Sequence, residues 1–146
     1  MKNIVFIPNI NLDDGRATPY HYSVKSWSKW CEKNNCEMVE WTEPIMDSKQ
    51  FPIILQREWV FDILEHNNVN YDQVLIVDAD TIVHPDCPNF FEMTNHKFTS
   101  VLTDGDYEWV NRAINGYSKL FFNKDFCIPS FEFFMTGFVI INKKHK

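Results

Sequence analysis

The stretch Gln73-Val74-Leu75-Ile76-Val77-Asp78-Ala79-Asp80 decides how the rest of the chain is interpreted. After its first glutamine, the run at residues 73–77 is apolar and mostly β-branched, which is typical of a strand buried on both faces. Two aspartates then flank a single alanine, and the apolar character returns at residues 81–83. The sequence therefore predicts a central strand with two carboxylates at its C-terminal end.

Strand-like and helix-like patterns alternate on both sides of this strand. Further strands are predicted at residues 4–7, 36–41, 99–103 and 138–142. Helices are predicted from an N-cap at Ser23 to about residues 34–35, from Pro52 to about residue 67, and from about residue 109 to 122. This alternation predicts βαβ units and an α/β fold, with a mostly parallel sheet flanked by helices.

The composition predicts one globular domain over residues 1–146. Apolar residues make up 45% and aromatic residues 16% of the chain, enough for a core without disulfide or metal staples. Lysine and arginine total 14 against 20 aspartate and glutamate residues, which gives a formal net charge of −6. This sign opposes general binding to a phosphate backbone, so we expect no nucleic-acid partner. An anionic ligand would need local positive groups or a metal.

The sequence shows no segment for membrane insertion, export or zinc binding. No apolar stretch approaches the roughly 20 residues of a transmembrane helix. The apolar run after Met1 is only strand-length, so a protein that starts there is expected to stay in the cytoplasm. The four cysteines, Cys31, Cys36, Cys87 and Cys127, contain no Cys-x-x-Cys pair, which favours free thiols in a reducing compartment over zinc.

Two polar regions are expected to meet at one edge of this sheet. The loop at residues 9–20 follows the first strand, and Asp78 and Asp80 follow the central one; in open α/β sheets, ligands bind beyond the carboxyl ends of strands. Two carboxylates about 5 Å apart repel by roughly 3 kcal/mol at an effective dielectric of about 20. A divalent cation offsets this most directly, and oxygen ligands favour Mg²⁺, Mn²⁺ or Ca²⁺. The alternative is that one aspartate caps the next segment and the other faces water.

Residues 71–83 carry a resemblance to a known family. The strand, Asp78-Ala79-Asp80 and the following Thr81-Ile82-Val83 resemble the Asp-x-Asp segment of metal-dependent nucleotide-sugar glycosyltransferases with the GT-A fold. Two predicted βα units precede it, and Met135-Thr136-Gly137-Phe138-Val139-Ile140-Ile141-Asn142 is similar to the family's Asn/Thr-Gly turn into a strand. The glycogenin-like branch and small glycan-building transferases of viruses or bacteria are the most similar in character. The resemblance implies a Rossmann-like GT-A fold.

The resemblance also implies an activity and a set of ligands. The chain would transfer a sugar from a nucleoside diphosphate sugar, with UDP the expected nucleotide, to a hydroxyl of a glycan or glycoprotein acceptor. Asp80 would ligate Mn²⁺ or Mg²⁺, Asp78 would share the metal or hold the ribose or donor sugar, and the Ala79 backbone would lie against the nucleotide. The metal would neutralise charge on the departing phosphate as a Lewis acid.

Further donor contacts are implied in the same way. Four residues of the loop after the first strand would cradle the base and ribose: Pro8, Asn9, Ile10 and Asn11. Tyr20 would stack on or border the base, and Arg57 would reach toward the donor and the first aspartate. The alternatives are that Arg57 pairs with Glu58, Asp62 or a neighbouring surface carboxylate, and that Tyr20 only orders its loop.

The acceptor side is less defined by the sequence. An inverting enzyme needs a carboxylate that deprotonates the acceptor hydroxyl, and the candidates by residue type are Asp104, Asp106, Glu108 and Glu132. Trp109 is a candidate platform for the acceptor. We expect the turn at residues 84–88 to be structural and the basic end at residues 143–146 to be solvated.

Two other functions fit the sequence. Domains of the family usually continue beyond the Thr-Gly strand with a helix and a further metal ligand. The first alternative is therefore a truncated domain or a non-catalytic nucleotide-sugar-binding module of a larger assembly. The second is an aspartate-nucleophile phosphatase, which also places Asp-x-Asp after a strand but expects its threonine one place later than Thr81.

Overall fold

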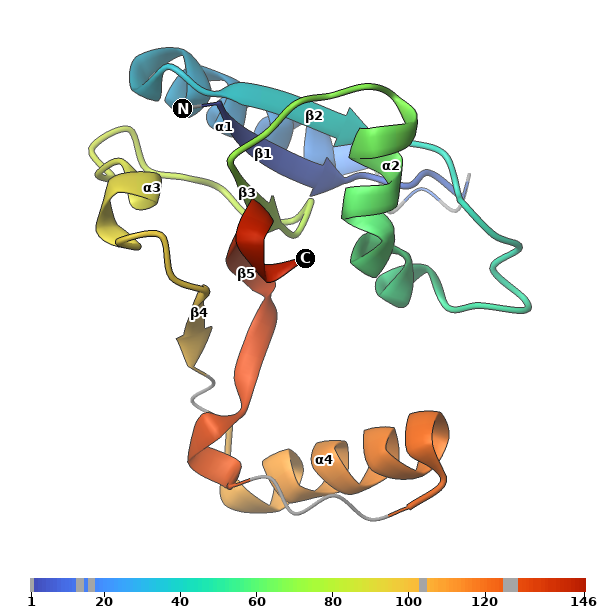
Figure 1. Cartoon of the computed structure of the whole chain (residues 1–146). Coiled ribbons are helices and arrows are strands. Elements are labelled where there is room, and N and C mark those ends of the chain that lie inside the picture. Colours follow the sequence, from blue (N-terminus) through green and yellow to red (C-terminus); the bar gives the residue numbers. More distant parts are fainter. Residues whose placement is uncertain (1, 13–14, 16–17, 103–104, 125–128) are drawn as a thin grey trace. The chain divides into compact units, whose positions relative to one another are not determined.

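The computed structural model describes residues 2–12, 15, 18–102, 105–124 and 129–146 (Figure 1). The chain divides into two compact units, one of Met1–Thr99 with Gly137–Lys146 and the other of Ser100–Thr136. Over the described residues, the strands form a five-stranded sheet in the order β2-β1-β3-β5-β4. The prediction of a single domain over residues 1–146 stays a prediction.

The first unit holds most of the sheet and the helices that cover it. Its strands are β1 (Asn3–Pro8), β2 (Glu37–Trp41) and β3 (Gln73–Val77), and most of β5 (Phe134–Asn142) also belongs to it. Its helices are α1 (His21–Asn34), α2 (Val60–His66) and the short α3 (Phe90–Met93), which the sequence did not indicate. Three 3-10 turns complete it: η1 (Thr18–Tyr20), η2 (Ile53–Trp59) and η4 (Lys143–His145).

The sheet is mixed. β1 pairs in parallel with both β2 and β3, whereas β5 runs antiparallel to β3, with Val77 opposite Phe138 and Gln73 opposite Asn142. The expectation of a mostly parallel sheet is therefore corrected at β5. Side chains alternate with a period of two in either strand direction, so the apolar pattern of β5 carries no information on its orientation.

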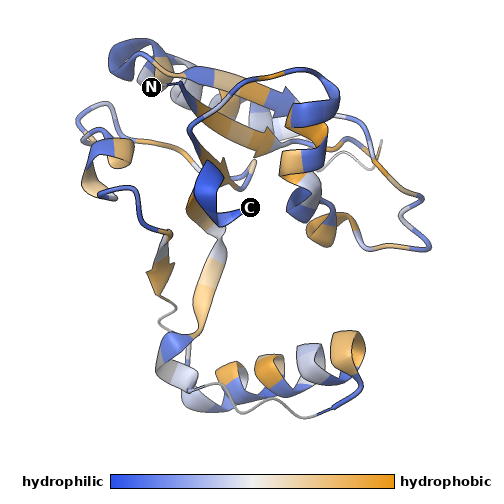
Figure 2. Cartoon of the chain, in the orientation of Figure 1, coloured by the Kyte–Doolittle hydropathy of each residue, from blue (hydrophilic) through white to orange (hydrophobic). Residues whose placement is uncertain are grey.

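Helices α1 and α2 cover opposite faces of the sheet. Every residue of β3 is buried, as is the centre of β1. Alternate strand residues, among them Val5 and Leu75, pack with Trp27 and Trp30 of α1. The residues between them, among them Ile4 and Val74, pack with α2. Figure 2 shows the resulting hydrophobic colouring along β1. The prediction of a strand buried on both faces is confirmed.

The N-terminal end of α1 differs from the prediction. The helix begins at His21, and its cap residue Tyr20 makes no side-chain capping bond, because η1 already leads into the helix with helical backbone angles. Ser23 is a buried residue inside the helix, so its assignment as the N-cap is wrong. The C-terminal end is as predicted, since Asn35 adopts the left-handed conformation with φ 51° that ends many helices.

The predicted long helix after Pro52 is divided into the 3-10 helix η2 and the α-helix α2. Within η2, the buried Gln56 side chain clasps the preceding loop. Its Oε1 accepts from the backbone N–H of Ile45 at 2.7 Å, and its Nε2 donates to the Met46 carbonyl at 3.0 Å. This clasp fixes η2 against the loop, a non-local interaction that helical periodicity does not encode.

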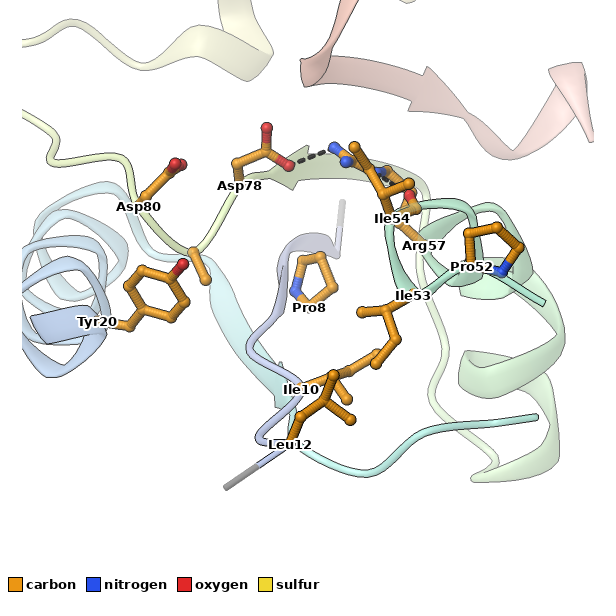
Figure 3. A pocket seen from close by; sticks show the side chains of 11 residues that line it. Pro8, Ile10, Leu12, Tyr20, Pro52, Ile53, Ile54, Arg57, Asp78 and Asp80 are labelled. Atoms are coloured by element: carbon orange, nitrogen blue, oxygen red, sulfur yellow. Dashed lines mark hydrogen bonds and ion pairs between the residues drawn. The ribbon is translucent and has the colours of Figure 1, made fainter. Parts of the chain in front are cut away.

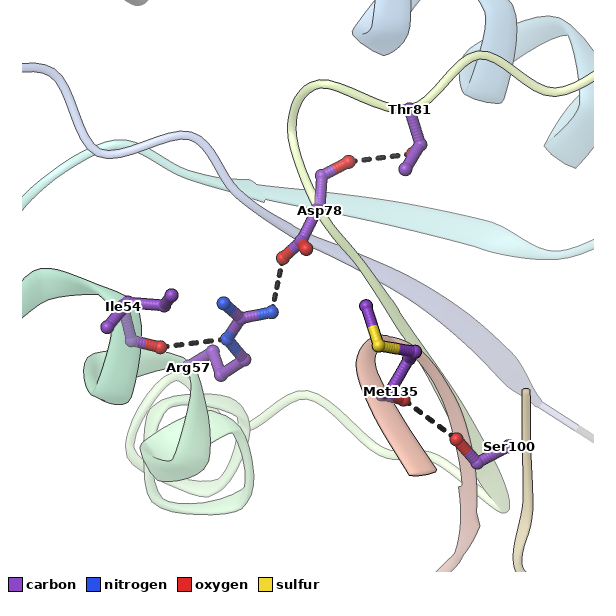
Figure 4. A network of polar contacts seen from close by, with 6 residues as sticks. All are labelled: Ile54, Arg57, Asp78, Thr81, Ser100 and Met135. Atoms are coloured by element: carbon purple, nitrogen blue, oxygen red, sulfur yellow. Dashed lines mark hydrogen bonds and ion pairs between the residues drawn. The ribbon is translucent and has the colours of Figure 1, made fainter. Parts of the chain in front are cut away.

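The second unit contains most of β4 (Thr99–Leu102), the helix α4 (Tyr107–Phe122) and the 3-10 turn η3 (Ser130–Glu132). Asp106 caps α4 by accepting from the Trp109 N–H at 2.8 Å. Ser100 Oγ donates to the Met135 carbonyl at 2.8 Å (Figure 4). No described helix is both long and apolar enough to cross a membrane.

Candidate functional site

A cavity of about 370 Å³ opens at the carboxyl ends of β1 and β3 in the first unit (Figure 3). Four elements line it: the end of β1 with its loop, η1, η2, and the turn after β3. The lining residues are Pro8, Ile10, Leu12, Tyr20, Pro52, Ile53, Ile54, Arg57, Asp78, Ala79 and Asp80. This edge of an α/β sheet is where ligands ordinarily bind.

Arg57 and Asp78 form an ion pair in the cavity wall (Figures 3 and 4). The Arg57 side chain is only 7% exposed, and its Nε donates to the carbonyl of Ile54 at 2.8 Å while Nη1 donates to Asp78 Oδ1. The guanidinium is therefore fixed from both ends, and it holds one oxygen of the Asp78 carboxylate in place.

The turn that carries both aspartates is anchored to neighbouring elements. The Asp78 N–H donates to the carbonyl of Gly137 in β5 at 3.1 Å. The Thr81 hydroxyl donates to the Asp78 carbonyl at 2.7 Å and accepts from Trp27 Nε1 of α1 at 3.0 Å. As a result, the Asp78 and Asp80 carboxylates point to the same side of the turn in Figure 3.

The surroundings of Asp78 raise its pKa above the ordinary value. Burial is the largest cause, since the side chain is 36% exposed, and the nearby charge of Asp80 acts in the same direction. Arg57 opposes both through its charge and its hydrogen bond. The cavity wall thus contains two carboxylates and only one guanidinium, and the single positive charge of Arg57 does not fully offset the effects that raise the pKa of Asp78.

Gly137 is part of the site because it has no side chain. A Cβ at this position would lie 3.1 Å from Asp78 Cγ and closer still to Oδ2. A side chain here would displace the carboxylate. From the sequence, Gly137 contributed only to the resemblance, because a contact between β5 and the turn after β3 cannot be found from either segment alone.

Seven of the predicted donor-binding residues line this one cavity: Pro8, Ile10, Tyr20, Arg57, Asp78, Ala79 and Asp80. Asn9 and Asn11 are not among its lining residues. Asn9 Nδ2 instead donates to Glu40 at 2.7 Å, and the backbone N–H groups of Asn9 and Asn11 donate to the carbonyls of Trp41, the last residue of β2, and of Thr42. The loop is therefore fastened to β2 by its asparagines and faces the cavity with its apolar residues.

Four lining residues were missed by sequence reasoning: Leu12, Pro52, Ile53 and Ile54. Leu12 and Ile54 are 41% and 63% exposed. The sequence feature that could have identified them is an apolar side chain in a loop, or next to a proline that starts a helix. Such side chains are more often assigned to the hydrophobic core, so they were missed.

The acceptor-side candidates belong elsewhere in the chain. Asp104 lies outside the described residues. Asp106 and Glu132 belong to the second unit, where Asp106 caps α4, and the role of either as acceptor base stays a prediction. Glu108 forms an exposed pair with Arg112 at 3.8 Å, and Trp109 packs edge-on against Phe133.

The donor set suits a hard divalent cation. The Asp78 oxygen left free by Arg57 and the exposed Asp80 carboxylate offer oxygen ligands only, which Mg²⁺ or Mn²⁺ accepts alongside water or phosphate oxygens. Among the described residues, no group of three or more His, Cys, Asp or Glu side chains is arranged to hold a metal. A cation at this edge would therefore take its remaining ligands from outside these side chains.

Comparisons with known proteins agree with the fold. No protein-family model and no curated protein matches the chain. Among solved structures, it is similar to "a glycosyltransferase involved in the glycosylation of the major capsid of PBCV-1", with a TM-score of 0.63 and 9% identity over 99% of this chain and 61% of that chain. A second structure, A197 from STIV, has a TM-score of 0.48 and 17% identity over 99% of this chain and 66% of that one. The chain thus has an α/β fold similar to that of a glycosyltransferase, and it spans 61% of that glycosyltransferase's length.

Proposed function

We propose that the chain is a GT-A-type glycosyltransferase domain that binds a nucleoside diphosphate sugar, with UDP as the nucleotide and Mn²⁺ or Mg²⁺ as the metal. The observation that carries the proposal is the single cavity that combines Asp78, Asp80 and Arg57 with apolar walls at the carboxyl edge of the sheet. The fold similarity to a glycosyltransferase supports it. The cavity volume also falls in the range of roughly 300–1,000 Å³ usual for small-ligand sites.

Different walls of the cavity would bind different parts of the donor. Ile10, Leu12 and Ile53 offer an apolar surface to a planar base, and Tyr20 borders the cavity from the side of α1 (Figure 3). Asp78 and Asp80 would hold the metal, and a metal bound there supplies Lewis-acid stabilisation of a diphosphate leaving group. Arg57 keeps Asp78 oriented and lowers the mutual repulsion of the acidic pair.

Isothermal titration of UDP and GDP, with and without Mn²⁺, tests the proposal. We expect UDP binding that requires the metal and falls at least about tenfold in Asp80→Ala, a loss of roughly 1.4 kcal/mol. Asp86→Ala is the matched control, because Asp86 is an exposed acid in the turn at residues 84–88 and does not line the cavity. Equal affinity in the two variants would contradict the assignment.

Turnover separates the proposal from its alternatives. Release of UDP from UDP-sugars, increased by a glycan or glycoprotein acceptor, is the expected result. Metal-dependent UDP binding without any release would instead support a non-catalytic nucleotide-sugar-binding module. Hydrolysis of a phosphate monoester by a protein with no nucleotide affinity would support the aspartate-nucleophile phosphatase.

A further inference from the structure

The C-terminal end of α1 brings two cysteines into contact. Asn35 in the left-handed conformation reverses the chain, and the backbone N–H groups of Asn35 and Cys36 both turn back to the Cys31 carbonyl. The bond from Cys36, 3.1 Å long, is the one that defines a Schellman-type helix end. A side-chain contact between the two residues joined by this bond frequently accompanies the motif, and here both residues are cysteines.

The thiols are close and differ in access. Cys36 Sγ lies 3.8 Å from the Cys31 carbonyl oxygen. Cys31 is 3% exposed and belongs to the core beneath α1, whereas Cys36 is half-buried at the margin of the same core. Hydrogen bonding between the two thiols is the largest cause of a raised pKa at Cys31 and a lowered pKa at Cys36. Cys36 is therefore the thiol that a reagent meets first and in the more reactive form.

We propose that Cys31 and Cys36 form a dithiol site that low-molecular-weight disulfides such as oxidised glutathione convert into an intramolecular disulfide. The Cys36 thiolate attacks one sulfur of oxidised glutathione, whose S–S bond breaks and releases one glutathione thiolate. Cys31 then loses its proton and attacks the Cys36 sulfur, which expels the second glutathione. Both protons end on the glutathione thiols, and the two electrons from the cysteines reduce the reagent.

The bridge would act on stability and leave the cavity unchanged. Cys36 directly precedes β2, and the cavity lies at the opposite, carboxyl ends of the parallel strands β1 and β3. The disulfide would link the last turn of α1 to the start of β2 and restrict the unfolded chain. For a loop this short, we expect the thermal midpoint to rise by about 5 °C.

The experiment uses the full chain in glutathione buffers of increasing oxidised fraction, quenched by alkylation and digested with trypsin without reductant. Cleavage after Lys29, Lys33 and Lys49 places the two cysteines on separate peptides, residues 30–33 and 34–49. We expect these peptides to appear joined, about 2 Da below their summed mass, and the midpoint to rise with the joined fraction.

Two serine variants make the test specific. Cys36→Ser, at a half-buried position that tolerates a hydroxyl, should abolish both the joined pair and the rise in midpoint. Cys87→Ser, at another half-buried free cysteine, should retain both. Glutathione stably attached to Cys36 with no joined pair would overturn the proposal, and so would a joined pair that forms only after Cys87 or Cys127 has reacted.

Discussion

The turn after β3 and the loop after β1 form two walls of one cavity, and they are held in different ways. The turn is fixed by the side chains of Arg57 in η2 and Trp27 in α1 and by the backbone carbonyl of Gly137 in β5. The loop is fixed by backbone bonds to residues 41 and 42 and by one side-chain bond from Asn9 to Glu40, and it leaves Leu12 41% exposed. The polar wall is thus pre-organised, whereas the apolar wall gains burial only when a ligand covers it.

The largest effect is expected when Arg57 is replaced by methionine. The change keeps the apolar stem but leaves Asp78 without its partner, and removing one member of a buried pair costs about 3 kcal/mol at the lower end of the usual range. Urea denaturation measures the loss. Arg112→Met is the matched control, because its pair with Glu108 is exposed and contributes less than about 0.5 kcal/mol. Similar losses in both variants would show that the turn does not depend on its ion pair.

Gly137→Ala is expected to have the next largest effect. The added Cβ meets the Asp78 carboxylate, and such overpacking costs about 1–3 kcal/mol and should abolish metal-dependent UDP binding. Gly116→Ala on α4 is the control, since its Cβ meets nothing within 4 Å and should gain up to about 1 kcal/mol of helix stability. Circular dichroism melts and UDP titration of both variants check this. Unchanged UDP binding in Gly137→Ala would remove Gly137 from the site.

Thr81→Val tests the anchor between the turn and α1. The buried Trp27 indole N–H would lose its acceptor, and an unpaired buried donor costs about 1–3 kcal/mol, with about 1 expected because Thr81 is only half-buried. Thr81→Ser keeps the hydroxyl and should retain most of the stability. The two variants are compared by urea denaturation, monitored by tryptophan fluorescence. Equal stability of the two would show that the hydroxyl is dispensable.

Leu12→Ala is expected to have the smallest effect on folding and to act on the ligand alone. Its side chain is already 41% exposed, so stability should change by less than about 0.5 kcal/mol. On the proposed function, UDP affinity should fall about threefold because part of the apolar cover of the base is lost. Ile82→Ala, 70% exposed and outside the cavity, should leave the affinity unchanged. A stability loss in Leu12→Ala above 1 kcal/mol would contradict the difference between the two walls.

The sequence predicted best what local pattern encodes. β3 was found with its exact bounds because every one of its residues is buried, and its run of apolar side chains leaves little ambiguity. The carboxylates after it follow from the same stretch. The proximity of Arg57 to Asp78 came from the resemblance, since spacing alone allowed Glu58 or Asp62 as partners.

What the sequence could not predict depends on contacts between distant segments. The alternation of side chains in β5 does not show whether the strand runs parallel or antiparallel, and the role of Gly137 depends on a carboxylate in the turn after β3. Ser23 has the residue type of an N-cap, but η1 starts the helical path earlier. Ile53 fits the apolar face of the predicted helix, but in the structure Ile53 and its neighbour Ile54 belong to the 3-10 helix η2 and line the cavity.

The Gln56 side chain holds together the two ends of the loop at residues 45–51, which precedes η2. Its amide holds Ile45 and Met46 on one side of the loop and the carbonyl of Phe51 on the other. Residues 47–50 lie between these contacts and are exposed, and the Gln56 hydrogen bonds hold the two ends of their loop together. A short peptide tag or a fluorophore attached between Ser48 and Lys49 should therefore leave η2 undisturbed, which gives this protein a natural position for a reporter group.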